Sequence, residues 1–143
     1  MNIKVTDELV KFADEFMLNL KGKRYLPVAA RVQIFRQLNP NGRIVVTPRV
    51  ADGYVEATIY DSHGIPMATD IKSIQAGGKG VAAAYPLEMA ATGAIGRALN
   101  LAGIGTMYGD LDEGDQIAES PVPQKKAKPK ATTDDVAGIV KGF

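Results

Sequence analysis

Two consecutive segments of this chain alternate apolar and polar residues, and this alternation is the feature that most constrains its fold. The first run covers residues 43–51 and the second covers 54–60, with an Asp-Gly pair between them that is typical of a hairpin turn. A third run, over residues 66–75, follows the sequence DSHG. Since side chains alternate between the two faces of a strand, the sequence predicts a three-stranded antiparallel meander. Pro48, within the first run, predicts an edge strand or a bulge there.

Three other segments repeat apolar residues three and four positions apart, as amphipathic helices do. They cover residues 6–20, 27–38 and 86–103, and the last two begin with a proline, which suits the first turn of a helix. The predicted fold class is therefore α+β. It has two N-terminal helices, then the meander, and then a packing helix that completes a β-β-β-α core.

Composition excludes several kinds of protein. The 143 residues contain no cysteine and one histidine, so we expect neither a disulfide framework nor a Cys- or His-rich metal site. No run reaches the ~18 to 20 apolar residues of a membrane-spanning helix, and the start MNIKVTDELVKF has acids where a signal peptide is apolar. We expect a cytoplasmic protein.

The composition changes near residue 110. Residues 110–119 contain five acids and no base, and residues 121–135 are rich in Pro, Lys and Thr. We predict a core domain over residues 1–111 and a flexible charged tail over 112–143. The last ten residues, DDVAGIVKGF, regain apolar residues at helical spacing, which indicates either a docking peptide or a frayed end.

Residues 21–49 form a window with seven basic residues and no acid, and we call it the basic window. Its members are Lys21, Lys23, Arg24, Arg31, Arg36, Arg43 and Arg49. A field of one sign over successive elements attracts polyanions by steering and counterion release. The alternative is that acids of the first predicted helix, Asp7, Glu8, Asp14 and Glu15, fold over the window and neutralise it.

The last predicted helix is made largely of small residues. Two internal glycines, Gly93 and Gly96, each cost about 1 kcal/mol relative to alanine, so something must compensate. Helical spacing places both glycines and Arg97 on the helix face that points away from the sheet. Leu87 and Leu101 are among the residues expected to face the sheet. That outer face would allow a phosphate chain or a neighbouring subunit to approach closely beside a cation. Tight packing within the chain is the alternative.

The sequence resembles phage and prophage single-strand annealing and single-stranded-DNA-binding proteins of the Erf-like and Rad-fifty-two-like superfamily. The resemblance covers about residues 21–106, in the strings KGKRYLPVAARVQIFRQLNPNGRI and LEMAATGAIGRALNLAGIGT. Its most specific element is the pattern of Glu88, Thr92, Gly93, Ala94, Gly96, Arg97, Ala98, Leu99 and Gly103. Where the family usually has a lysine after the helix-opening glutamate, this chain has Met89.

The resemblance implies a β-β-β-α core in a non-catalytic protein that binds one DNA strand and promotes annealing in homologous recombination or repair. If the protein is phage-encoded, its location is the host cytoplasm. The resemblance also implies a homo-oligomeric ring or filament, no nucleotide cofactor, and no metal. Further expected partners are an exonuclease or a host single-strand-binding protein, contacted through the tail. Together with the basic window it predicts DNA contacts at Lys21, Lys23, Arg24, Tyr25, Arg31, Arg36, Arg43, Arg49, Lys72, Lys79 and Arg97. Gly93 and Gly96 are the predicted sites of close approach between subunits.

Two other hypotheses remain open at this stage. Asp61, Asp70 and Lys72 form a D…D-x-K pattern, which metal-dependent nucleases use to hold Mg²⁺ beside a phosphate. The GGKG sequence of residues 77–80 resembles the backbone-clamping loop of a small RNA-binding module, although it follows a strand here. Tyr54 and Tyr60 share one strand face with Glu56, which an ordinary half-buried face explains.

Overall fold

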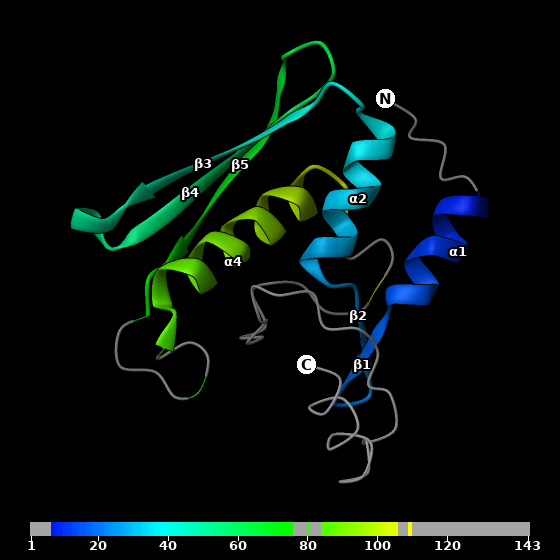
Figure 1. Ribbon diagram of the computed structural model, residues 1–143, viewed down its shortest axis with the longest axis horizontal. Coiled ribbons are helices and arrows are strands. Elements are labelled where there is room, and N and C mark those ends of the chain that lie inside the picture. Colours follow the sequence, from blue (N-terminus) through cyan, green and yellow to red (C-terminus); the bar gives the residue numbers. More distant parts are fainter. Residues whose placement is uncertain (1–6, 76–79, 81–83, 106–108, 110–143) are drawn as a thin grey trace, which may run out of the picture.

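The structure, a computed structural model, describes residues 7–75, 80, 84–105 and 109. It is a mixed α+β fold in which a three-stranded antiparallel sheet packs against helices (Figure 1). The sheet consists of β3 (Arg43–Arg49), β4 (Tyr54–Tyr60) and β5 (Pro66–Ser73), in that order across the sheet. The predicted meander is confirmed, and Pro48 lies on the edge strand β3. The sheet's irregularity occurs at Ile59 and Tyr60 of β4 instead.

The central strand β4 shows why the sheet has one buried face. Val55, Ala57 and Ile59 have no exposed surface, while the residues between them are half-buried. Helix α4 (Pro86–Leu101) contacts all three strands and covers the face that carries these residues (Figure 1). Among the described elements, no helix contacts the opposite face, which we call the outer sheet face. It carries alternate residues of each strand, beginning with Arg43 on β3.

Two further helices continue the helical layer beside α4. Helix α2 (Val28–Leu38) packs against α4, and helix α1 (Asp7–Phe16) packs against α2. Pro27 precedes α2 with φ of −56°, as suits a helix start. The core therefore joins Phe35 of α2 and Leu99 of α4 to the buried face of the sheet.

The first helix is shorter than its apolar spacing predicts. It ends at Phe16, and β1 (Leu18–Leu20) pairs with β2 (Lys23–Tyr25) as a hairpin, in place of the last helical turn that the spacing predicts. Lys21 and Gly22 form the two-residue turn, with φ of 52° and 80°. Positive φ at both turn residues suits the twist of a tight hairpin, so this turn overrides the helical pattern of residues 17–20.

Candidate nucleic-acid interface

Six of the seven cations of the basic window are exposed, and five of these six fall into two groups. Lys21, Lys23 and Arg24 belong to the β1–β2 hairpin. Arg43 and Arg49 begin and end β3, and the hairpin lies well away from that strand (Figure 1). The sixth exposed cation is Arg36 of α2, which donates a hydrogen bond to the carbonyl oxygen of Gly42. The fold thus splits a window that is continuous in the sequence into separate exposed basic patches.

The acids of α1 do not neutralise these patches. Asp7, Glu8, Asp14 and Glu15 are all exposed, and within the described residues none of them forms an ion pair with Lys21, Lys23, Arg36, Arg43 or Arg49. The contact between α1 and α2 is instead apolar, since Leu9 and Ala13 are the buried residues of α1. Within the described residues, these five cations therefore keep their positive field.

Two predicted DNA contacts, Tyr25 and Arg31, are buried, and their prediction as surface groups is wrong. Tyr25 is 1% exposed and Arg31 has no exposed surface. The Arg31 guanidinium lies over the Tyr25 ring, 5.2 Å from its centroid. Its Nε donates to the carbonyl oxygen of Leu26 at 2.8 Å, and a terminal nitrogen donates to that of Gly96 at 3.1 Å. Arg31 is thus a structural cation that joins α2 to α4.

The predicted outer face of α4 is also wrong. Gly93 and Gly96 are buried, whereas Leu87 and Leu101, expected to face the sheet, are 38% and 62% exposed. A Cβ on Gly93 would lie 2.9 Å from Cγ of Lys72, so this glycine makes room for a β5 side chain. Because α4 lies between the sheet and α2, it is buried on two sides, and its small residues serve packing within the chain. Neither glycine is placed for contact with another subunit.

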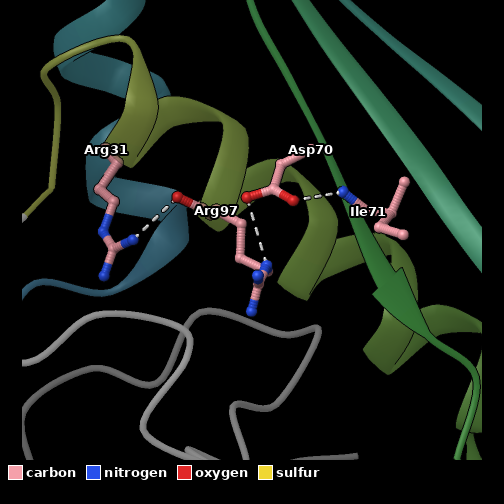
Figure 2. Close-up of polar contacts among 5 residues, drawn as sticks. Arg31, Asp70, Ile71 and Arg97 are labelled. Carbon is pink, nitrogen blue, oxygen red and sulfur yellow. Dashed lines mark hydrogen bonds and ion pairs between the residues drawn. The ribbon is translucent and has the colours of Figure 1, made fainter.

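Arg97 of α4 forms an ion pair with Asp70 of β5 (Figure 2). Arg97 Nε lies 3.3 Å from Asp70 Oδ2, and the two side chains are 35% and 22% exposed. The other carboxylate oxygen accepts a hydrogen bond from the backbone N–H of Ile71 at 2.7 Å. Arg97 is therefore at the surface, but part of its charge is offset by Asp70.

The three residues of the nuclease pattern do not come together. Asp61 is 7% exposed, and its Oδ1 accepts hydrogen bonds from the backbone N–H groups of His63 and Ile65 at 2.8 and 2.9 Å. Asp70 lies opposite Ala57 of β4. Ala57 precedes Asp61 by four residues, which corresponds to about 13 Å along an extended chain, so Asp70 and Asp61 are separated by about that distance. Within the described part of the chain, no cluster of three His, Cys, Asp or Glu residues is arranged to hold a metal.

The outer sheet face carries two cross-strand arginine–tyrosine pairs. From the sequence, the two tyrosines are interpreted only as part of an ordinary half-buried face. Arg43 lies opposite Tyr60, and Arg49 lies opposite Tyr54. The guanidinium carbon of Arg43 is 4.8 Å from the centroid of the Tyr60 ring. The strand alternation places all four residues on one face, but a two-residue Asp-Gly turn would pair Ala51 with Tyr54. The structure instead has a 3-10 turn over Val50–Asp52, and this longer connection brings Arg49 opposite Tyr54.

Some predicted features fall outside the described residues. These are Lys79, residues 77–79 of the GGKG loop, and the tail over 112–143 with its terminal peptide. Within the described residues, no helix is long and apolar enough to cross a membrane. No family model, no curated protein and no solved structure matches this chain.

Proposed function

We propose that this protein binds single-stranded DNA and promotes strand annealing, as an oligomeric ring or filament and without nucleotide hydrolysis. The observation that carries the proposal is the set of exposed cations that have no ion-pair partner within the described residues. They are Lys21 and Lys23 on the hairpin and Arg43 and Arg49 on β3. Such cations are available for phosphates, whose release of counterions drives nucleic-acid binding.

The separation of the two basic patches favours a single strand over a duplex. The β1–β2 hairpin and β3 lie at different ends of the molecule (Figure 1). A duplex is stiff over ~150 base pairs and must be bent at a cost to follow a curved surface, whereas a single strand can follow it readily. The order β3–β4–β5–α4 also agrees with the β-β-β-α core that the resemblance implies.

The burial of Gly93 and Gly96 removes one argument for self-association, and the proposal of a ring or filament rests on the resemblance alone. The same holds for a role in phage recombination or repair, and for an exonuclease or host single-strand-binding protein as partner of the tail. Electron microscopy with and without single-stranded DNA tests the assembly, because a monomer in both samples excludes a ring or filament.

Binding is tested by titrating labelled single-stranded DNA, duplex DNA and RNA of one length at several salt concentrations. We expect preference for single-stranded DNA and a log–log salt slope of about 0.7 per phosphate contacted. The single variants Arg43→Gln and Arg49→Gln should each lower both the affinity and the slope. Lys11→Gln, which removes an exposed charge of α1, is the matched control and should change neither. Equal affinity for duplex, or a flat response to salt, contradicts the proposal, and Mg²⁺-dependent cutting of the DNA would favour the nuclease instead.

A further inference from the structure

The two arginine–tyrosine pairs occupy opposite ends of the β3–β4 ladder, and the cation lies over the ring in the Arg43–Tyr60 pair. Arg43 with Tyr60 begins the ladder and Arg49 with Tyr54 ends it, next to the hairpin turn. The members of each pair belong to opposite strands, and all four residues lie on the outer sheet face. Arg43 and Arg49 are six positions apart on β3, which corresponds to about 20 Å along the strand.

The surroundings of the pairs are accessible and mostly uncharged. Val45 of β3 and Ile71 of β5 are 39% and 45% exposed on this face. The hydroxyl oxygens of Thr58 and Thr69 are 2.9 Å apart and exposed. Glu56 is the one acid on the described strands of this face, and it lies between the two pairs. A polyanion is therefore attracted at the two ends of the ladder more strongly than at its centre.

We propose that each arginine–tyrosine pair is a stacking site for one base of a single-stranded nucleic acid, an inference that rests on the proposed function. A planar ring and a planar guanidinium both stack on bases, and the guanidinium also forks onto phosphate. The Arg43–Tyr60 pair already has the cation over the ring, so its geometry is formed before the strand binds. A duplex keeps its bases stacked on each other, which leaves these sites selective for single strands.

Stacking on a pair uses the face of a base and leaves its hydrogen-bonding edge free. A base held in this way is still able to pair with a complementary strand. The two sites would thus fix bases at a spacing of about 20 Å while the nucleotides between them stay accessible. The outer sheet face would therefore bind bases, whereas the hairpin cations would bind phosphates only. The residues of strands β1 and β2 include no exposed aromatic side chain.

The test compares the affinity of the protein for a twelve-nucleotide oligothymidylate with its affinity for an abasic oligonucleotide of the same length and charge. We expect the wild-type chain to bind the oligothymidylate at least ten-fold more tightly, since stacking contributes beyond the phosphate contacts. Tyr60→Leu and Tyr54→Leu should each reduce this preference several-fold, while Tyr60→Phe should keep it. Tyr85→Leu, which removes an exposed ring before α4, is the control and should leave the preference unchanged.

Each outcome has a distinct meaning. Tight binding of both oligonucleotides with equal affinity overturns the stacking sites and leaves the proposed DNA binding intact, whereas binding of neither overturns both. If the leucine variants change the particle size in light scattering and leave the base preference unchanged, the face is a contact between copies and the inference is wrong.

A measurement on the wild-type chain covers the case in which the leucine variants fail to fold. Photocrosslinking with 5-iodouracil-substituted oligonucleotide, mapped by mass spectrometry, should give adducts at Tyr54 or Tyr60. Adducts found only elsewhere contradict the proposal.

Discussion

The stem of Lys72 lies across Gly93, so that a Cβ at position 93 would approach Cγ of this lysine to 2.9 Å and Cδ to 3.2 Å. The contact joins β5 to α4 and explains how a glycine is retained in the interior of a 16-residue helix. Alanine would add about 1 kcal/mol of helix propensity at this position. Whether Gly93→Ala raises or lowers the free energy of unfolding therefore depends on the contact with Lys72.

We therefore expect Gly93→Ala to destabilise the protein by about 1 kcal/mol in spite of its better helix propensity. In a Lys72→Ala background the same substitution should stabilise it by about 1 kcal/mol, because the clash is gone. Chemical denaturation of the four members of this double-mutant cycle measures the coupling. Additive effects of the two substitutions would show that Lys72 does not limit the space at Gly93.

Arg31 should matter for stability far more than the exposed arginines do. Arg31→Ala leaves a cavity and removes a buried donor from the carbonyl groups of Leu26 and Gly96, so we expect a loss of about 3 kcal/mol. Arg43→Ala, at an exposed position, should change the free energy of unfolding by less than about 0.5 kcal/mol. Thermal and urea denaturation compare the two, and similar losses would contradict the structural role of Arg31.

Removing the acid of the Asp70–Arg97 pair should expose the arginine to a ligand. Asp70→Asn is expected to cost at most about 1 kcal/mol in stability, since both side chains are partly solvated. If Arg97 contacts DNA as proposed, the same variant should raise affinity for single-stranded DNA more than Asp14→Asn, which makes the same charge change at an exposed site of α1. Equal gains for the two variants would indicate a general charge effect without a contact at Arg97.

The hairpin turn allows charge and folding to be separated. Lys21 has a positive φ of 52° beside Gly22, and asparagine adopts this conformation at lower cost than lysine does. Lys21→Asn should therefore keep or slightly raise the thermal midpoint while it lowers DNA affinity and reduces the salt slope by about 0.7. A lower midpoint would mean that the turn depends on the lysine, and an unchanged slope would remove Lys21 from the interface.

The sequence alone was sufficient to predict those elements that depend on the spacing of apolar residues over a short stretch of chain. The alternation of Val55, Ala57 and Ile59 predicted the buried face of β4, and all three have no exposed surface. The Asp-Gly sequence predicted that β3 pairs with β4, although β3 ends at Arg49 and a 3-10 turn over Val50–Asp52 precedes the glycine. Pro27 marked the start of α2. These features follow from local sequence because strand alternation and proline geometry act within a few residues.

The tertiary structure decided which members of the basic window are available to a ligand. Lys23 and Arg31 are both basic residues of that window, yet the first is exposed and the second is buried beside α4. The difference arises because a carbonyl oxygen of α4, 65 residues away, accepts a hydrogen bond from Arg31.

The same holds for the faces of α4 and for the hairpin. Small residues are compatible with burial on any side of a helix, so only the positions of β5 and α2 show that Gly93 and Gly96 face inward. Charge, small size and periodicity are properties of single residues and their neighbours along the chain. Whether a side chain is buried, and which groups it contacts, depends on elements that are distant in sequence. Only the folded chain brings those elements together.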